Sequence, residues 1–453
     1  MKWQKLSRKN KICLAFIIVN ITVLLLITSY YGSRLIRYYR LENPKIKEKE
    51  TLANIITLEK NLVLVGNGLY EKDNVFYYKG KDVNNYVSYS GRLWQIISVN
   101  EDHTVKMITV DNQTSLVWGI NNDYEKSHVR KWLNSNSEEH SGIFYDTLYN
   151  PDIYIKDSTW CIDIIDKNPD TCEKTIKDKI GLLSIFEYNR ALGSASFLNT
   201  NTYWWMINGS LDNNVWYAYP EGKVNNESSL NTAYYSYGVR PVINLKKDVK
   251  VYGGDGSENN PYIIEPESNN ILNQKRVGEY VKYSNYTWRI ANITDNYVQV
   301  YMDGFIQEKG KDIDSRFSTI DNVYSSDKSM GKYLNTEFYN TLSNQDYLVD
   351  SKWYIGNYDY KVDYNYKNIY NSSTLGKVGM LHVGSLFIED FEDYFLMTRQ
   401  NNYEDTIYKV VENGKIFADY IESSSHVRPA ISLKADIIVK SGNGKKDNPY
   451  IIE

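Results

Sequence analysis

The sequence predicts a β-rich α+β protein in which one N-terminal transmembrane helix is followed by two homologous mixed modules. Two observations lead to this prediction. The segment Val239–Glu265 (VRPVINLKKDVKVYGGDGSENNPYIIE) returns as Val427–Glu453 (VRPAISLKADIIVKSGNGKKDNPYIIE), with identical residues at 16 of 27 positions. Ahead of both copies lies Ile12–Tyr31, a run of 20 residues without a charge. An internal repeat of this length indicates the domain organisation before any single motif is considered.

The N-terminal run has the length of a membrane-spanning helix. Twenty uncharged, mostly apolar residues are enough to cross a bilayer. Five basic residues precede the run and three follow it, which favours a cytoplasmic N-terminus. We therefore expect a cytoplasmic tail at 1–11, an anchor in the lipid bilayer at 12–31 and a juxtamembrane spacer at 32–60. The rival interpretation is a cleaved signal peptide, but the apolar run is long for one and TSYYG is a poor cleavage site.

The two copies correspond along their whole length. Tyr86–Thr109 matches Tyr280–Met302, and further short matches follow in the same order. At about 190 to 200 residues, each copy is long enough to bury a core of its own. We therefore place module 1 at 61–265 and module 2 at 266–453.

Alternation of apolar and polar residues predicts paired strands at the start of each module. They are expected at Arg92–Val99 and Val105–Val110, and again at Thr287–Ile293 and Tyr297–Met302. A more helical stretch follows in both copies, VRKWLN in the first and MGKYLN in the second. Each module closes on a strand that contains VRP, where the proline must lie at a strand start or edge.

Composition and motifs exclude several classes of function. A net charge of −4 with 24% charged residues leaves no basic stripe for nucleic acid. The five histidines have no spacing typical of a metal site, and the sequence has no nucleophile elbow and no phosphate-binding loop. We therefore predict no catalytic residues, no cofactor and no metal. The GGDG segment (Gly253–Gly256) suggests either a calcium loop or, more simply, a tight turn.

Cysteine usage favours an extracytoplasmic location. Cys161 and Cys172 enclose a short loop, which suits a disulfide in an oxidising compartment. The alternative is a pair of free thiols, because module 2 has no equivalent pair. Cys13 lies within the predicted anchor.

Aromatic residues in module 1 are the first candidates for binding. Trp204, Trp205, Trp216 and Tyr217 form the densest aromatic group in the chain. Because side chains alternate along a strand, one tryptophan of the Trp204–Trp205 pair is expected to face outward. An outward tryptophan could stack on a sugar ring or anchor a protein partner. The alternative is that both belong to the core.

Two arginines are the second candidates. Arg240 and Arg428 occupy the same place in the two copies, inside an otherwise apolar strand. A buried arginine needs a partner, and Asp248 and Asp436, eight residues further on, are the expected ones. The pair either anchors a ligand or locks the core.

The succession IGLLSIFEYNRA, YWWMIN, VWYAYPEGKVN and YGVRPVINL in module 1 resembles a family of uncharacterised extracytoplasmic domains of Gram-positive bacteria. The resemblance covers nearly all of both modules, and it implies a layout similar to C-type-lectin-like and formylglycine-enzyme-like folds. Module 2 departs from the pattern, since YWWMIN (Tyr203–Asn208) is matched there by YFLMTR (Tyr394–Arg399).

These observations predict a membrane-anchored surface protein with tandem binding modules. The expected partners are an envelope polysaccharide or a surface protein. A structural accessory subunit of an envelope complex is the first alternative, and a cell-wall-modifying enzyme the second. The enzyme would need a pair of carboxylates across a cleft, and no such pair can be singled out.

Overall fold

The computed structural model describes residue 21 and residues 49–119, 121–134, 142–165, 172–226, 235–308, 311–358, 366–388 and 392–453. Thr51–Glu453 form one compact unit. Apart from Ile21, the predicted tail and anchor lie outside the described residues, as does most of the spacer. Within the ranges given above, no helix is both long and apolar enough to cross a membrane.

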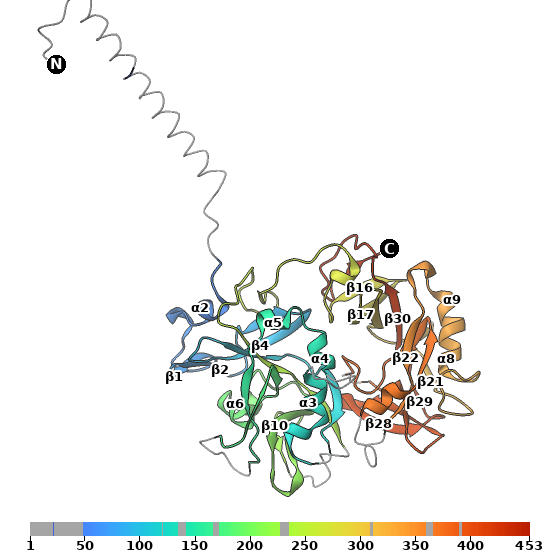
Figure 1. The fold of residues 1–453 in the computed structure, drawn as a ribbon, viewed down its shortest axis with the longest axis horizontal. Helices are drawn as coiled ribbons and strands as arrows, with labels where there is room; N and C mark the ends of the chain where they lie inside the picture. The colour runs from blue at the N-terminus through green and yellow to red at the C-terminus, as the bar shows by residue number, and fades with distance from the viewer. Residues whose placement is uncertain are drawn as a thin grey trace, which may run out of the picture. The chain divides into compact units, whose positions relative to one another are not determined.

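The β-rich α+β class is confirmed, and module 1 is built on two sheets (Figure 1). The first sheet has the order β15-β3-β4-β5-β14-β9, and the hairpin β1–β2 joins it at β4. Its strands are β1 (Gly68–Lys72), β2 (Val75–Lys79), β3 (Tyr86–Tyr89), β4 (Arg92–Val99), β5 (Val105–Thr109), β9 (Ile180–Gly181), β14 (Val242–Leu245) and β15 (Tyr262–Ile263). The second sheet has the order β12-β11-β10-β13-β6. Its strands are β6 (Thr114–Val117), β10 (Trp204–Gly209), β11 (Val215–Ala218), β12 (Val224–Asn225) and β13 (Ser236–Val239), and a separate ribbon pairs β7 (Ser158–Cys161) with β8 (Thr175–Asp178).

Short helices with local caps connect these strands. The α-helices of module 1 are α2 (Leu52–Ile56), α3 (His128–Leu133), α4 (Ile143–Asp146), α5 (Pro151–Tyr154) and α6 (Ile185–Arg190). Its 3₁₀ turns are η2 (Glu59–Asn61), η3 (Tyr124–Lys126), η4 (Gly193–Ala195) and η5 (Leu211–Asn213). Helix α3 begins where the Ser127 hydroxyl accepts the Arg130 N–H, and a capping box of Ser184 and Glu187 starts α6.

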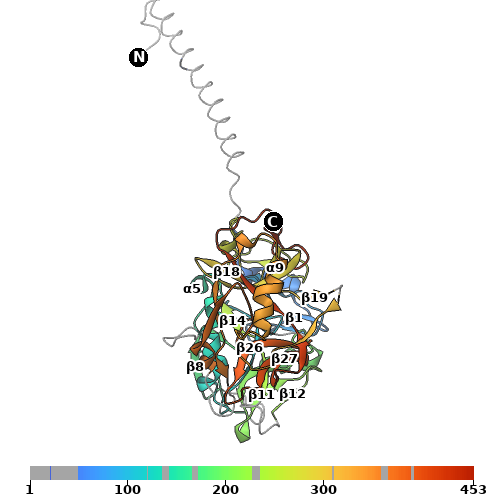
Figure 2. The same ribbon diagram turned by 90° about the vertical axis from the view of Figure 1, so that its right-hand side faces the viewer.

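Module 2, part of which faces the viewer in Figure 2, repeats this plan in its strand order. Its first sheet, β31-β16-β17-β18-β30-β25, contains β16 (Tyr280–Tyr283), β17 (Tyr286–Ile293), β18 (Tyr297–Met302), β25 (Val378–Met380), β30 (Pro429–Lys434) and β31 (Tyr450–Ile451). Its second sheet, β21-β29-β26-β27-β28 with β23 beside β26, contains β21 (Asp314–Arg316), β23 (Asn357–Tyr358), β26 (Tyr394–Gln400), β27 (Thr406–Val411), β28 (Lys415–Tyr420) and β29 (Ser424–His426). Two ribbons pair β19 (Gln307–Glu308) with β20 (Lys311–Asp312), and β22 (Ser351–Tyr354) with β24 (Ser373–Gly376). Its helices and turns are η6 (Leu272–Gln274), α8 (Met330–Tyr333), the π-helix η7 (Leu334–Phe338), α9 (Tyr339–Thr341), η8 (Gln345–Tyr347), η9 (Tyr366–Asn371) and η10 (Glu412–Gly414).

The repeat extends to details of the backbone. In the first sheets, β4–β5 and β17–β18 each shift register, between Ile96 and Ser98 and between Ile290 and Asn292. In the second sheets, β10 and β26 also shift register against their neighbours. Identical strand orders with bulges at the same places show that the two copies share one architecture.

The hydrogen bonds correct the sequence alignment of the tryptophan motif by one residue. Trp204 pairs with Gly238, and in module 2 Tyr394 pairs with the equivalent His426. Trp204 therefore corresponds to Tyr394, whereas aligning YWWMIN with YFLMTR matched Tyr203 to Tyr394. A slip of one residue exchanges the two faces of a strand, so every side-chain comparison along β10 and β26 changes.

The structure also moves the start of module 1 from residue 61 to Thr51. Thr51 forms a β-bridge with Lys250, and the N–H of Leu52 donates to the carbonyl of Val249 at 2.8 Å. Module 2 begins in the same way, with a bridge between Ile271 and Ile438. Residues 51–60, which we assigned to the spacer, are therefore part of the folded module.

Candidate binding site

Both tryptophans of the central pair lie in the core of module 1, as the second of the two interpretations predicts, and neither faces outward. Trp204 packs edge-on against Tyr188 on one side of the sheet, with ring centroids 5.7 Å apart. Trp205 packs against Trp118 on the other side, and its indole N–H donates to the carbonyl of Leu116 at 2.8 Å. The alternation is present, but other elements cover both faces of β10, so neither ring is available to a ligand.

Trp216 and Tyr217 lie on the neighbouring strand β11. The indole N–H of Trp216, a half-buried side chain, donates to the carbonyl of Ile165 at 3.0 Å. Tyr217 is buried, and its hydroxyl donates to that of Tyr219 at 3.2 Å.

The two predicted arginines brace the core. Arg240 is fully buried, and its Nε and both terminal nitrogens donate to the carbonyls of Thr109 and Leu198 at 2.6–3.0 Å. Arg428 donates from Nε to the equivalent carbonyl, that of Met302, at 2.9 Å. Asp248, the carboxylate expected to pair with Arg240, is exposed, as is Asp436 in module 2. Main-chain carbonyls thus hold the guanidiniums between the strands.

Five tyrosines form a cluster at one end of the second sheet of module 1. We call Tyr203, Tyr217, Tyr219, Tyr235 and Tyr237 the tyrosine cluster. The rings of Tyr217 and Tyr237 lie 4.6 Å apart, and Tyr203 stacks on Tyr237 at 5.2 Å. Burial raises the pKa of Tyr237 and Tyr217 well above that of a free phenol. Tyr235 stacks on Tyr237 at 5.9 Å and remains 43% exposed, so the cluster extends from the core to the surface.

Module 2 has polar residues at the equivalent places. By the corrected alignment, Tyr203 corresponds to Asp393, Tyr217 to Lys409 and Tyr237 to Ser425. Lys409 lies between two carboxylates there, 3.5 Å from Asp393 and 2.9 Å from Asp419. The aromatic face therefore belongs to module 1.

Strand β28 of module 2 covers this face of module 1. The ammonium of Lys415 lies 3.7 Å from the centre of the Tyr203 ring, a cation–π contact. Ser236 on β13 exchanges two hydrogen bonds with the main chain of Ile416, and Ser115 donates to the carbonyl of Gly414. Burial lowers the pKa of Lys415, so its charge is partly removed from water.

A loop of module 2 makes the second contact between the modules. The carbonyl of Gly384 accepts the indole N–H of Trp132 at 2.8 Å, and that of Ser385 accepts the Thr114 hydroxyl at 2.7 Å. The ring of Phe387 enters between the guanidiniums of Arg289, at 3.7 Å, and Arg92, at 5.6 Å. The two modules therefore dock through specific side chains.

A cavity of about 500 Å³ adjoins the β28 contact, since Ser236, Lys415 and Ile416 also line the cavity, and this volume is within the size range of ligand pockets. Both modules line it. Its apolar and aromatic lining residues are Leu116, Val117, Tyr235, Tyr358, Val383, Tyr408, Val411, Ile416, Phe417 and Ala418, and its polar ones are Ser236, Gln400 and Lys415. Such a lining takes an apolar group and leaves a few hydrogen-bonding atoms to orient it.

Sequence reasoning found Tyr217, which belongs to the tyrosine cluster, but none of the residues that line the cavity. Tyr235 and Tyr237 stand within the run YYSYG before the VRP motif, so tyrosine density was the one available signal. Tyr358, Gln400 and Tyr408 line the cavity only because of how module 2 docks on module 1, and no local sequence pattern encodes this docking.

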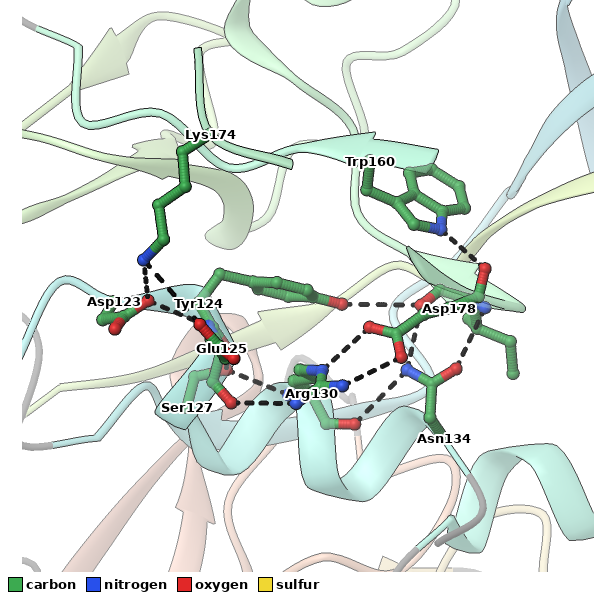
Figure 3. Close-up of polar contacts among 10 residues, drawn as sticks. Asp123, Tyr124, Glu125, Ser127, Arg130, Asn134, Trp160, Lys174 and Asp178 are labelled. Atoms are coloured by element: carbon green, nitrogen blue, oxygen red, sulfur yellow. Dashed lines mark hydrogen bonds and ion pairs between the residues drawn. The ribbon is translucent and has the colours of Figure 1, made fainter. Parts of the chain in front are cut away.

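A polar network in module 1, away from the cavity, is structural (Figure 3). Arg130 on α3 forms a two-pronged ion pair with Asp178 on β8, with nitrogen–oxygen distances of 2.8 and 3.1 Å. Trp160 donates to the Asp178 carbonyl, and Asn134 donates to that of Ile180. Cys161 and Cys172 are joined as a disulfide at the end of the same ribbon. These bonds hold the ribbon β7–β8 against α3.

Two places in the chain hold oxygen or nitrogen atoms of the kind that bind metals. The GGDG segment forms a tight turn in which the Asp255 carboxylate accepts both the main-chain N–H and the hydroxyl of Ser257. Elsewhere in the described ranges, Asp312, Glu392 and His426 bring ligating atoms within 4.8 Å of one another. Asp312 and Glu392 are exposed, and the imidazole Nδ1 lies 3.0 Å from the carbonyl of Asp393, so we base no proposal on this group.

Comparison with known proteins found no matching family model, no matching curated protein and no matching solved structure.

Proposed function

We propose that this chain is a membrane-anchored, extracytoplasmic binding protein whose ligand site is the cavity between its two modules. The cavity itself carries the proposal, because both modules contribute side chains to its lining. Because the site needs side chains from both modules, it gives a reason for the tandem arrangement. It also gives a reason why the equivalent faces of the two modules differ.

The location belongs to the same proposal. The uncharged run 12–31 supports an anchor in the bilayer, and the Cys161–Cys172 disulfide suits an oxidising compartment outside the cytoplasm. The resemblance to Gram-positive extracytoplasmic domains, with its lectin-like layout, points the same way.

The lining favours an apolar segment of a surface protein as the ligand. Most of its side chains are aliphatic or aromatic, and Phe417 on β28, which lines it, is 56% exposed. Apolar and aromatic side chains of a partner would gain most from such a site. An envelope polysaccharide is the second candidate, because the exposed ring of Tyr235 offers a stacking surface for a sugar.

The remaining alternatives receive less support. The lining residues include one lysine but no carboxylate, so the cavity does not supply the acid pair of a glycosidase. An accessory subunit would use a broad flat surface, whereas the cavity is a concave site.

The test is a selection from a random peptide library on fragment 49–453, which contains the whole compact unit. Ala418→Trp fills the cavity, and Leu375→Trp places the same ring on an exposed strand of module 2 as a control. We expect apolar peptides whose affinity falls at least tenfold with A418W and is unchanged with L375W. Saturable binding to purified wall polysaccharide, lost with Tyr235→Ala, would select the second candidate. Ligands that bind A418W as well as the wild type would refute the cavity as the site.

A further inference from the structure

An exposed apolar loop lies near the start of the folded unit. It connects η2 to β1, and its sequence is LVLVGN (Leu62–Asn67). Leu64 is 96% exposed and Val65 is 83% exposed, more than any other large apolar side chain in the described ranges. Single exposed apolar residues are common on proteins, but two adjacent ones at the tip of an ordered loop require an explanation.

The loop presents these side chains in a fixed conformation. The N–H of Val63 donates to the carbonyl of Leu69 at 2.9 Å, and the hydroxyl of Tyr70 donates to the carbonyl of Gly66 at 2.7 Å. Gly66 has a φ of +85°, which lets the chain reverse just after Val65. Local hydrogen bonds therefore hold Leu64 and Val65 away from the module.

The fold does not need this loop. In module 2, η6 ends at Gln274 and β16 begins at Tyr280, with no hairpin between them. In module 1 the same connection runs from Ile56 to Tyr86 and contains the loop and the hairpin β1–β2. The extra segment is specific to the module that follows the predicted anchor.

The chain length places a bilayer within reach of the loop. Seventeen residues, 32–48, separate the end of the predicted span from Lys49. They extend over about 60 Å at most, and over about 27 Å as a helix. From Thr51 the chain is fixed in the module, and the loop begins eleven residues later. A chain anchored in this way can bring Leu64 and Val65 to the membrane surface.

The surroundings of the loop suit a membrane interface. Tyr70 and Tyr77 stack at 5.9 Å, and the ammonium of Lys79 lies over the Tyr70 ring at 4.9 Å. Tyrosine and lysine are typical of the boundary between headgroups and acyl chains. The charges near the loop balance, because Lys60 and Lys72 stand beside Glu59 and Glu71 in the sequence. Electrostatic attraction to anionic lipid is therefore not what would drive the loop to the membrane.

We infer that Leu64 and Val65 insert into the outer leaflet of the membrane that anchors the chain, orienting the modules on its surface. This inference rests on the membrane anchor of the proposed function. Two side chains bind a bilayer weakly by themselves, but the tether raises their effective concentration at the surface to the millimolar range. The contact is therefore a property of the anchored chain and is independent of lipid charge and salt.

The test uses the full chain in nanodiscs of phosphatidylcholine, with Cys13→Ser to remove the thiol in the predicted anchor. An environment-sensitive fluorophore is attached at Leu64→Cys, or at Leu375→Cys as a control, since Leu375 is 75% exposed in module 2. Lipids that carry a quencher in the acyl chain are then added. We expect at least twofold quenching at position 64 and none at 375, with no change between 50 mM and about 500 mM salt.

The outcomes separate this inference from the proposals it rests on. If the chain does not enter nanodiscs, the anchor is refuted, and the membrane contact with it. If the chain enters but position 64 is quenched no more than position 375, the contact alone is refuted. Neither result affects the cavity test, which uses a fragment without the anchor.

Discussion

At the scale of single residues, the two copies differ by paired substitutions. Arg130 and Asp178 form an ion pair in module 1, and glycines stand at both equivalent places in module 2, Gly331 and Gly376. A Cβ at Gly331 would lie 2.0 Å from the carbonyl oxygen of Tyr324, so module 2 has no room for a side chain there. The ion pair is thus specific to module 1, where it holds the disulfide-linked ribbon β7–β8 against α3.

A double-mutant cycle measures this ion pair. We expect Arg130→Ala and Asp178→Ala each to lower the free energy of unfolding by about 2 to 3 kcal/mol, because each leaves the other charge poorly compensated. The double variant should lose less than the sum of the two, with a coupling of about 1 to 3 kcal/mol, measured by urea unfolding of fragment 49–453. Strictly additive losses would show that the pair does not brace the ribbon.

At the scale of elements, the same segment serves two purposes in the two modules. After Leu183, module 1 forms helix α6 with its capping box. After the equivalent Leu381, module 2 forms a loop that docks on module 1 and ends with Phe387 at a φ of +62°. A phenylalanine in this left-handed region costs about 1 to 2 kcal/mol, which its contacts with the two arginines offset.

Two substitutions of Phe387 distinguish the stabilising effect of its ring from the cost of its strained backbone. Phe387→Ala should lower the free energy of unfolding by about 3 to 5 kcal/mol, because it leaves a hole between the modules and retains the strained φ. Phe387→Gly removes the same ring but relieves the strain, so we expect it to be about 1 kcal/mol more stable than F387A. Urea unfolding of both variants tests this order, and a glycine variant less stable than the alanine variant would contradict the role given to the backbone.

The sequence predicted the elements better than their assembly. Alternation located β4, β5, β17 and β18 within about a residue, because each of these long strands carries its own pattern. Tryptophan alternation on β10 was a poor guide to exposure, since Tyr188 covers one face and Trp118 the other, and both come from distant segments. The cavity escaped prediction because Leu116 and Ala418 meet only through docking of the modules.

At the scale of the whole molecule, the two copies use their last residue differently. Both end in NPYIIE, and in both the final glutamate accepts the N–H of a turn serine, Ser90 for Glu265 and Ser284 for Glu453. Glu265, however, lies at the junction of the modules, 3.6 Å from Nε of Arg276 at the start of module 2. Burial at this junction raises the pKa of Glu265 to about 7, although Arg276 acts in the opposite direction.

The junction should therefore make the stability of the compact unit depend on pH. Because the pKa of Glu265 is higher in the folded state than its ordinary value of 4.5, the folded state binds the proton more tightly. Protonation of Glu265 therefore stabilises the folded state, and this contribution to the free energy of unfolding is fully present below pH 4.5. It is lost as pH rises through about 7, a loss of about 3 kcal/mol. Buried His128 has the opposite pH dependence. Burial lowers its pKa to about 4, so its contribution to the free energy of unfolding is lost as pH falls below 6.5. The difference between wild type and Glu265→Gln isolates the glutamate.

Urea unfolding of fragment 49–453 at pH 5 and pH 7.5 measures this dependence. We expect Glu265→Gln to be close to the wild type at pH 5, where Glu265 is largely protonated in the folded state, and more stable than the wild type at pH 7.5, where the wild type buries a charge. Glu453→Gln makes the same change at the other end of the repeat, and it shows how much of the effect comes from losing a carboxylate that accepts the turn serine. If E265Q and the wild type lose stability in parallel between the two pH values, Glu265 does not carry the dependence. If they diverge as expected, the contact between module 1 and the start of module 2 is a pH-sensitive joint.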